Sequence, residues 1–241
     1  MPELASRLHQ LQCRISGATA PAAGRSRLLA VSKTRGIEEI AALAALGQLA
    51  FGENYVQEAL PKIAACAADP GLPGLEWHLI GRLQSNKARE AAHAFDWVQT
   101  VDRAKLADAL SRHRDPARPA LNVLIQVNVD GEPGKGGCEP HEVPALATHV
   151  AALPRLALRG LMAIPAPVPD PSTRRAAFRS LAALQTRLAA THPGLDTLSM
   201  GMSDDFELAL AEGATLVRIG TALFGPRPPK PKQAATTTES A

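Results

Sequence analysis

The chain has 241 residues, of which 46% are hydrophobic, 20% charged and 3% aromatic, and its formal net charge is +3. A chain of this size can bury a large core, either as one barrel or doubly wound domain or as two smaller domains. The last sixteen residues carry +2 of the charge and aromatic side chains that could stack on bases are few, so the composition argues against nucleic-acid binding.

The beginning of the chain predicts a helix. The stretch MPELASRLHQLQCRIS places charged and aliphatic residues at helical spacing, which is not the pattern of a secretory signal. The longest apolar runs fall well short of the roughly 20 residues that span a bilayer. We therefore expect an N-terminal helix and a cytoplasmic protein without a membrane segment.

The rest of the chain repeats one unit, a short aliphatic run followed by a polar or glycine-containing turn and a longer stretch with helical spacing. Eight such runs occur, at residues 27–33, 49–54, 76–81, 97–102, 120–129, 156–165, 197–201 and 216–225. Strands that alternate with helices pair in parallel, and eight units in this length predict a single closed (β/α)8 or TIM barrel. An open doubly wound sheet is the alternative, but no GxGxxG follows the first strand.

The domain prediction assigns residues 1–225 to the N-terminal helix and the barrel. The remaining stretch, 226–241, reads PRPPKPKQAATTTESA and has almost no apolar residues. Such a composition does not bury enough surface to offset the entropy of ordering, so we expect this tail to be disordered.

The cysteines indicate neither a disulfide framework nor a metal site. Cys13, Cys66 and Cys138 are far apart and form no CxxC pair.

A barrel brings together the polar residues that end its strands, because the carboxyl ends of all eight strands meet at one mouth. The residues expected there are Lys33, Glu53, Asn54, His78, Asp102, Asn128, Asp130, Arg159, Ser199, Ser203, Arg218, Gly220 and Thr221. The loops after the last two strands are common phosphate sites in barrels. Ser203 is placed to cap a helix that begins at Asp204, and Gly220 and Thr221 offer backbone amides and a hydroxyl, although a simple cap and a simple turn explain each feature singly.

Lys33 is the one lysine of the barrel that closes an apolar strand, in LLAVSK. The other lysines, Lys62, Lys87, Lys105 and Lys135, fall in helical or loop segments, where a solvated face explains them. Burial and a nearby cation such as Arg218 are expected to lower the pKa of Lys33, and a neutral amine can form a Schiff base with a carbonyl compound. A carbonyl compound that also carries a phosphate is either a sugar phosphate or pyridoxal phosphate. The simpler alternative is that Lys33 extends into the mouth and pairs with Glu53.

Six motifs resemble the pyridoxal phosphate homeostasis protein family, whose fold is related to the barrel domain of alanine racemase. They are LLAVSKT, FGENYVQE, EWHLIGRLQSNK, LNVLIQVNVD, LRGLMAIPAP and SMGMSDDFELALAEGATLVRIGTALFG. The resemblance extends from the N-terminal helix to Gly225.

The resemblance implies a set of cofactor-binding residues, namely Lys33, Asn54, His78, Ser203, Arg218, Gly220 and Thr221. Lys33 is implied to form the internal aldimine with pyridoxal phosphate, and Arg218 to face the pyridine nitrogen. The phosphate is implied to lie at Ser203, Gly220 and Thr221, and Asn54 and His78 are implied to line the ring pocket. Lys135, in GEPGKGG, matches a lysine that the family places on a mobile loop near the site.

The implied function is to hold pyridoxal phosphate as a lysine aldimine and to take part in intracellular vitamin B6 homeostasis or delivery, with little or no catalysis. An arginine at the pyridine nitrogen leaves that nitrogen unprotonated, which makes the ring a weaker electron sink. Alanine racemases resemble this arrangement and still catalyse, with a second domain and a tyrosine from the partner subunit. Here the chain ends shortly after the barrel, and its one tyrosine is Tyr55.

Two alternatives stay open. The first is a pyridoxal phosphate-dependent amino-acid racemase or decarboxylase in which His78 or Lys135 supplies the second acid or base. The second is an aldolase without a cofactor, in which Lys33 attacks a sugar phosphate. The expected partners are pyridoxal phosphate and apo-enzymes that use it, and the expected assembly is a monomer or a weak homodimer.

Overall fold

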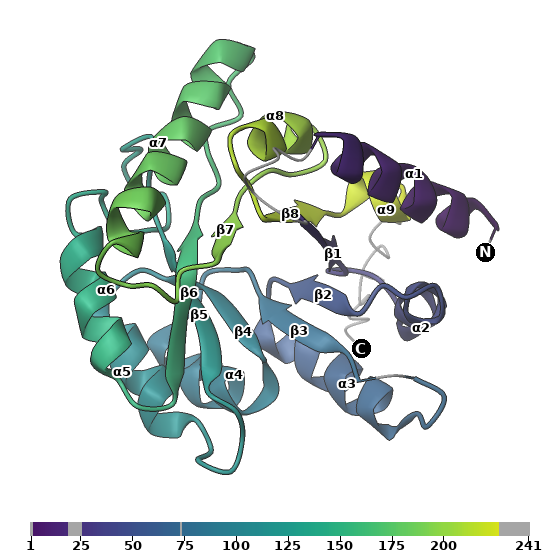
Figure 1. The fold of residues 1–241 in the computed structure, drawn as a ribbon. Helices are drawn as coiled ribbons and strands as arrows, with labels where there is room; N and C mark the ends of the chain where they lie inside the picture. The colour runs from purple at the N-terminus through teal and green to yellow at the C-terminus, as the bar shows by residue number, and fades with distance from the viewer. Residues whose placement is uncertain (1, 19–25, 73, 227–241) are drawn as a thin grey trace, which may run out of the picture.

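The computed structural model describes residues 2–18, 26–72 and 74–226 and folds them into a closed barrel of parallel strands (Figure 1). The strands are β1 (Arg27–Val31), β2 (Ala50–Glu53), β3 (Glu76–Leu79), β4 (Trp97–Val101), β5 (Leu121–Gln126), β6 (Leu156–Met162), β7 (Thr197–Ser199) and β8 (Leu216–Ile219). Each strand pairs with the next along the chain, and β8 pairs with β1 to close the barrel. The predicted (β/α)8 barrel is confirmed.

Helices surround the barrel and connect its strands (Figure 1). They are α1 (Pro2–Ala18), α2 (Ile37–Ala45), α3 (Val56–Ala68), the short 3-10 helix η2 (Ser85–Lys87), α4 (Ala88–Ala94), α5 (Ala104–His113), α6 (Val143–Ala152), α7 (Pro171–Ala189), α8 (Phe206–Ala211) and α9 (Thr221–Phe224). The predicted N-terminal helix is α1, which buries Leu8, Leu11 and Ile15 along one face and lies beside α8 and α9. That spacing of three and four residues is the period of a helix with one apolar stripe.

The strands are shorter than the aliphatic runs that predict them. Val31 ends β1, so Lys33 lies two residues beyond the strand. The run 216–225 is not one strand, because Gly220 ends β8 and its carbonyl oxygen accepts hydrogen bonds from the amides of Leu223 and Phe224, which starts α9. The predicted disordered tail, residues 226–241, lies outside the described residues except for Pro226.

The core has two compartments. The larger one fills the space between strands and helices, as it does in barrels generally. Inside the barrel lie two small apolar clusters as well as buried polar side chains. The first cluster contains Leu29, Val31, Ala50, Ile80 and Leu216, and the second contains Trp97, Leu124 and Met162. No helix within the described ranges is long and apolar enough to cross a membrane.

Candidate functional site

Lys33 lies in a turn at the carboxyl end of the barrel, with its side chain partly buried. The turn is held in place by Arg35, whose Nη2 donates to the carbonyl oxygens of Gly225 at 2.6 Å and Pro226 at 3.0 Å. The Arg35 guanidinium also lies over the ring of Phe224, 5.3 Å from its centroid. The lysine turn is therefore fixed against the end of α9.

A buried ion pair supports the same turn from behind. The Glu53 carboxylate is fully buried, and its Oε1 accepts hydrogen bonds from Ser32 Oγ at 2.6 Å and Lys62 Nζ at 2.8 Å. Lys62 Nζ also donates to the carbonyl oxygen of Ser32 at 3.0 Å. Lys62 thus neutralises Glu53 and fixes the backbone next to Lys33. The sequence interpretation, which assigned Lys62 to a solvated helix face, is wrong.

The loops after β7 and β8 are tied together by one hydrogen bond. Ser203 Oγ accepts from the amide of Ala222 at 3.3 Å. Since α8 begins at Phe206, Ser203 does not cap it, and that part of the sequence prediction is wrong. Gly201 makes the turn after β7 with a φ of 91°, and a Cβ there would lie 2.6 Å from the Cβ of Ala209. Glycine is therefore required for the path that brings Ser203 to α9.

The lysine turn and the β8 loop line a common cavity. Its wall is formed by Val31, Lys33, Thr34, Arg35, Gly220 and Thr221, and its volume is about 30 Å³. Lys33 and the predicted phosphate loop are therefore neighbours across a narrow space at the barrel mouth. A single group that enters this space, such as one end of a larger ligand at the mouth, contacts both segments.

Arg218 is buried on β8, two residues before Gly220. Its Nη1 donates to Ser199 Oγ at 2.7 Å and its Nη2 donates to the carbonyl oxygen of Ala163 at 2.8 Å. Burial lowers the pKa of the guanidinium to about 10, so it stays charged at neutral pH. Within the described residues no carboxylate forms a hydrogen bond or ion pair with it. Arg218 is therefore a fixed cation without a directly bonded carboxylate in that part of the chain, and the charge of Asp205 acts on it from farther away.

Asn54 and His78 have different surroundings. Asn54 directly follows β2 and is partly buried, and a Cβ at Gly81 would lie 2.0 Å from its carbonyl oxygen, so the ends of β2 and β3 are closely packed. His78 is fully buried, with Nδ1 2.9 Å from Gln99 Nε2 and Nε2 2.7 Å from Glu76 Oε1. A neutral imidazole has one donor and one acceptor nitrogen, and both are used here. His78 is thus left without a nitrogen for a ligand.

One other residue of the predicted mouth, Arg159, is placed differently from expectation. Arg159 donates to Asn122 Oδ1 at 2.9 Å and to Asp196 Oδ1 at 3.1 Å, two residues at the amino ends of β5 and β7. Its predicted place at the mouth is wrong. It follows that a polar residue within an aliphatic run can face the opposite end of the barrel.

Lys135 lies on the long loop between β5 and α6, and acidic residues hold it. Its Nζ is 2.9 Å from Asp130 Oδ2 and 3.1 Å from Glu132 Oε2. Partial burial acts to lower the pKa of Lys135, but the hydrogen bonds to these two carboxylates raise it above its ordinary value. Asp130 Oδ2 also accepts from the amide of Ala166 at 2.7 Å, which joins this loop to the one after β6. Lys135 is therefore a protonated ammonium.

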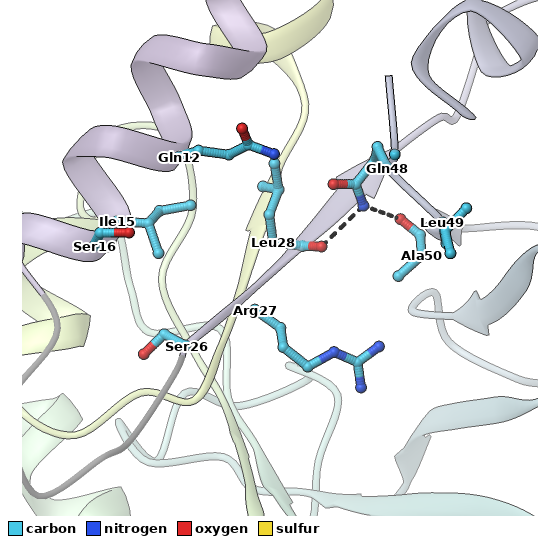
Figure 2. Close-up of a pocket in the computed structure, with 10 residues that line it drawn as sticks. Gln12, Ile15, Ser16, Ser26, Arg27, Leu28, Gln48, Leu49 and Ala50 are labelled. Atoms are coloured by element: carbon cyan, nitrogen blue, oxygen red, sulfur yellow. Dashed lines mark hydrogen bonds between the residues drawn. The ribbon is translucent and has the colours of Figure 1, made fainter. Parts of the chain in front are cut away.

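A larger cavity, of about 590 Å³, lies at the amino end of the barrel, between α1, β1 and the segment before β2 (Figure 2). Gln48 reaches across it and donates to the carbonyl oxygens of Leu28 at 3.0 Å and Ala50 at 2.8 Å. The site of chemistry in barrels is the carboxyl end. The smaller cavity at Lys33 is therefore the candidate site.

The sequence interpretation missed three side chains that build the site: Arg35, Lys62 and Gln99. Gln99 is a polar residue in the middle of the apolar run WVQTV, and that position is the one signal that could have identified it. Lys62 and Arg35 are indistinguishable in sequence from surface residues. Among the described residues, no group of three or more His, Cys, Asp or Glu is arranged to hold a metal ion.

Comparison with known proteins identifies the family. The model of the alanine racemase N-terminal domain matches residues 7–228. The pyridoxal phosphate homeostasis protein of Vibrio cholerae is 53% identical over 208 residues, covering 85% of this chain and 88% of its own. The protein of that name from Pseudomonas aeruginosa is 52% identical over 231 residues, covering 94% and 97%.

A solved structure agrees with these relatives. PipY of Synechococcus elongatus, solved with PLP bound, superimposes with a TM-score of 0.79 at 38% identity, over 92% of this chain and 100% of its own. Sequence identity at this level over nearly the whole chain indicates membership of the same family and not only a common fold. This chain belongs to the pyridoxal phosphate homeostasis protein family.

Proposed function

We propose that this chain binds pyridoxal phosphate covalently and reversibly through Lys33, and holds it for release or delivery with little or no catalysis. The observation that carries the proposal is the common cavity of Lys33, Gly220 and Thr221 at the carboxyl end of the barrel. The binding of PLP by PipY, at 38% identity, supports the choice of ligand.

The residues present fit the chemistry of this molecule. Pyridoxal phosphate supplies an aldehyde that condenses reversibly with a primary amine. Lys33 supplies the amine, and the Gly220–Thr221 segment with Ser203 supplies amide and hydroxyl groups for a phosphate. Arg218 supplies a donor for the ring nitrogen, since its guanidinium has further N–H groups besides the two that bond Ser199 and Ala163. Asn54 lies at the end of β2, where it can border the ring.

The proposal of little or no catalysis rests on the state of three possible acid–base groups. Lys135 is held protonated by two carboxylates. Both ring nitrogens of His78 are bonded to protein groups. Tyr55 is 60% exposed at the start of α3. None of the three is in a state that would let it remove a proton from a substrate at Lys33.

Borohydride reduction followed by peptide mass spectrometry tests the site. We expect a pyridoxyl group on the peptide that contains Lys33, and none in the Lys33→Ala variant. Lys87→Ala is the matched control, because Lys87 pairs with Glu90 on an outer helix. Labelling at another lysine, or no labelling, would refute the assignment and, in the second case, favour the aldolase alternative.

The exchange of amino-acid α-protons separates a carrier from an enzyme. We expect the loaded protein to exchange the α-proton of alanine into deuterated water at a rate close to that of free pyridoxal phosphate. Exchange at an enzyme-like rate would establish the racemase alternative instead.

The proposal includes the location and partners that the sequence indicates. We place the protein in the cytoplasm, without nucleic-acid or membrane partners, and infer that apo-enzymes that use pyridoxal phosphate receive the cofactor. A monomer or weak homodimer is the assembly that we propose, which sedimentation at micromolar concentration can test.

A further inference from the structure

A row of hydrogen bonds crosses the inside of the barrel from Arg218 to the amino end of β3. Arg218 Nη1 contacts Ser199 Oγ at 2.7 Å, and Ser199 Oγ contacts Gln99 Oε1 at 2.7 Å. Gln99 Nε2 lies 2.9 Å from His78 Nδ1, and His78 Nε2 lies 2.7 Å from Glu76 Oε1. Four strands, β8, β7, β4 and β3, contribute to this row.

The row has one direction. A guanidinium only donates, so Ser199 Oγ accepts from Arg218 and directs its own proton to Gln99 Oε1. The Gln99 amide group then donates to His78 Nδ1, which must be unprotonated, and the His78 proton lies on Nε2 and points to Glu76. Every donor is matched by an acceptor, and the row ends at a carboxylate.

The surroundings of His78 stabilise the neutral ring that this direction of the hydrogen bonds requires. Burial lowers the pKa of His78, and although the Glu76 carboxylate acts in the opposite direction, the net shift favours the neutral ring. The ring stacks on Trp97 at 5.0 Å between centroids. The charged groups that act on it are Glu76, Arg27 and Asp96, and Arg27 also donates to Glu76.

We infer that Gln99 and Ser199 are positioning residues for Arg218, and that neutral His78 sets their direction. The Ser199 hydroxyl offers its lone pairs to the guanidinium because its proton is committed to Gln99. Together with the carbonyl oxygen of Ala163, this acceptor fixes the plane of the guanidinium. The orientation of the group that meets the ligand is therefore determined by residues that do not touch the ligand. This inference rests on the proposed function for the role of Arg218.

Protonation of His78 on Nδ1 would reverse the row. Gln99 would have to turn its amide so that Oε1 meets the ring and Nε2 meets Ser199. Ser199 would then receive protons from both Gln99 and Arg218, and its own proton would lose the Gln99 acceptor. The geometry of Arg218 is thus coupled to the protonation of a histidine on the far side of the barrel interior.

Substitutions along the row test the positioning role in the loaded protein. Ser199→Ala and Gln99→Met each remove a link, and we expect both to weaken the binding of pyridoxal phosphate by about tenfold, the effect of one hydrogen bond to a charged group. We also expect both to shift the pH profile of the absorption of the bound molecule. Ser111→Ala is the matched control, because Ser111 is a buried serine on α5 that donates to the carbonyl of Pro154, outside the barrel interior.

A pair of substitutions at position 78 separates positioning from packing. An asparagine amide oxygen can replace the Nδ1 acceptor, whereas a leucine of similar size cannot. We expect His78→Asn to keep more of the wild-type pH profile than His78→Leu. Wild-type profiles and affinities in Ser199→Ala, Gln99→Met and His78→Leu would overturn the inference.

Nitrogen NMR of histidine-labelled wild-type protein tests the direction without any ligand. We expect His78, assigned with the His78→Asn spectrum or by through-bond correlation, to be the neutral Nε2–H form at pH 7. An Nδ1–H or doubly protonated ring would overturn the direction of the row. If borohydride reduction left Lys33 of the wild type unlabelled, the proposed function would fail, while this spectrum would still decide the state of the row.

Discussion

Removing Lys62 should destabilise the protein more than its position on an outer helix indicates. Among the residues that the structure describes, the Lys62→Met variant leaves the fully buried Glu53 carboxylate with Ser32 Oγ as its one hydrogen-bond donor on Oε1, and with no partner on Oε2. Leaving one charge of a buried pair unmatched costs roughly 3–5 kcal/mol. Since the Lys62 side chain is 14% exposed, water can reach part of the pair, and we expect the lower end of this range.

The assay is unfolding by urea or heat, followed by tryptophan fluorescence at neutral pH. A loss of about 3 kcal/mol lowers the melting temperature of a domain of this size by roughly 6–12 °C. The control is Lys87→Met, which removes a partly exposed pair with Glu90 and should cost less than about 1 kcal/mol. Lys62→Met combined with Glu53→Gln should be less destabilised than Lys62→Met alone, because no unmatched charge remains. Equal melting temperatures for Lys62→Met and Lys87→Met would refute this reasoning.

Three further predictions follow from other features. Ellman's reagent should label Cys13 of the folded protein rapidly and Cys66 and Cys138 slowly. Cys13 is exposed, whereas burial raises the pKa of the other two thiols, that of Cys138 to about 12. Rapid labelling of all three cysteines would contradict this burial. The free energy of unfolding should fall as the pH drops below about 6.5, because the unfolded chain then binds a proton at His78 that the buried ring of the folded protein does not take up. For one group the slope is at most about 1.4 kcal/mol per pH unit. The His78→Asn variant should flatten this part of the curve, and an unchanged slope in the variant would assign the effect to another group. Gly201→Ala should cost roughly 1–3 kcal/mol and weaken pyridoxal phosphate binding, because it places a Cβ against Ala209 at a φ of 91°. The control is Gly213→Ala, which has a φ of 96° and no atom near the added Cβ, and which therefore shows the cost of the backbone strain alone. Equal binding of pyridoxal phosphate by the two variants would contradict the role of Gly201.

The architecture could be predicted from the sequence because parallel strands buried on both faces appear as aliphatic runs. Each of the eight runs contains a strand in the structure, and each strand is shorter than its run by one to several residues. The run at 216–225 was too long because aliphatic residues of a short helix, Ala222 to Phe224, follow β8 directly. Hydrophobicity alone does not distinguish the continuation of a strand from a helical turn that follows the strand after a glycine.

The site could be predicted only in part. Lys33, Gly220 and Thr221 line one cavity as expected, since barrel topology places the ends of β1 and β8 side by side. The direction of a side chain within a strand is harder to predict. Glu53 ends β2 on the face toward α3 and Arg159 reaches the amino end, because in each case a partner in another element, Lys62 or Asp196, determines the direction. Such long-range partners leave no local pattern in the sequence.

A crystal structure of the protein with pyridoxal phosphate tests the central claim most directly. We expect Lys33 Nζ to be bonded to the carbon of the former aldehyde, with the phosphate at the Gly220–Thr221 segment and the Ser203 hydroxyl, and with Arg218 at the ring nitrogen. A molecule bound at the amino-end cavity of Figure 2, or one whose phosphate points away from the β8 loop while its ring lies at Lys33, would contradict the claim.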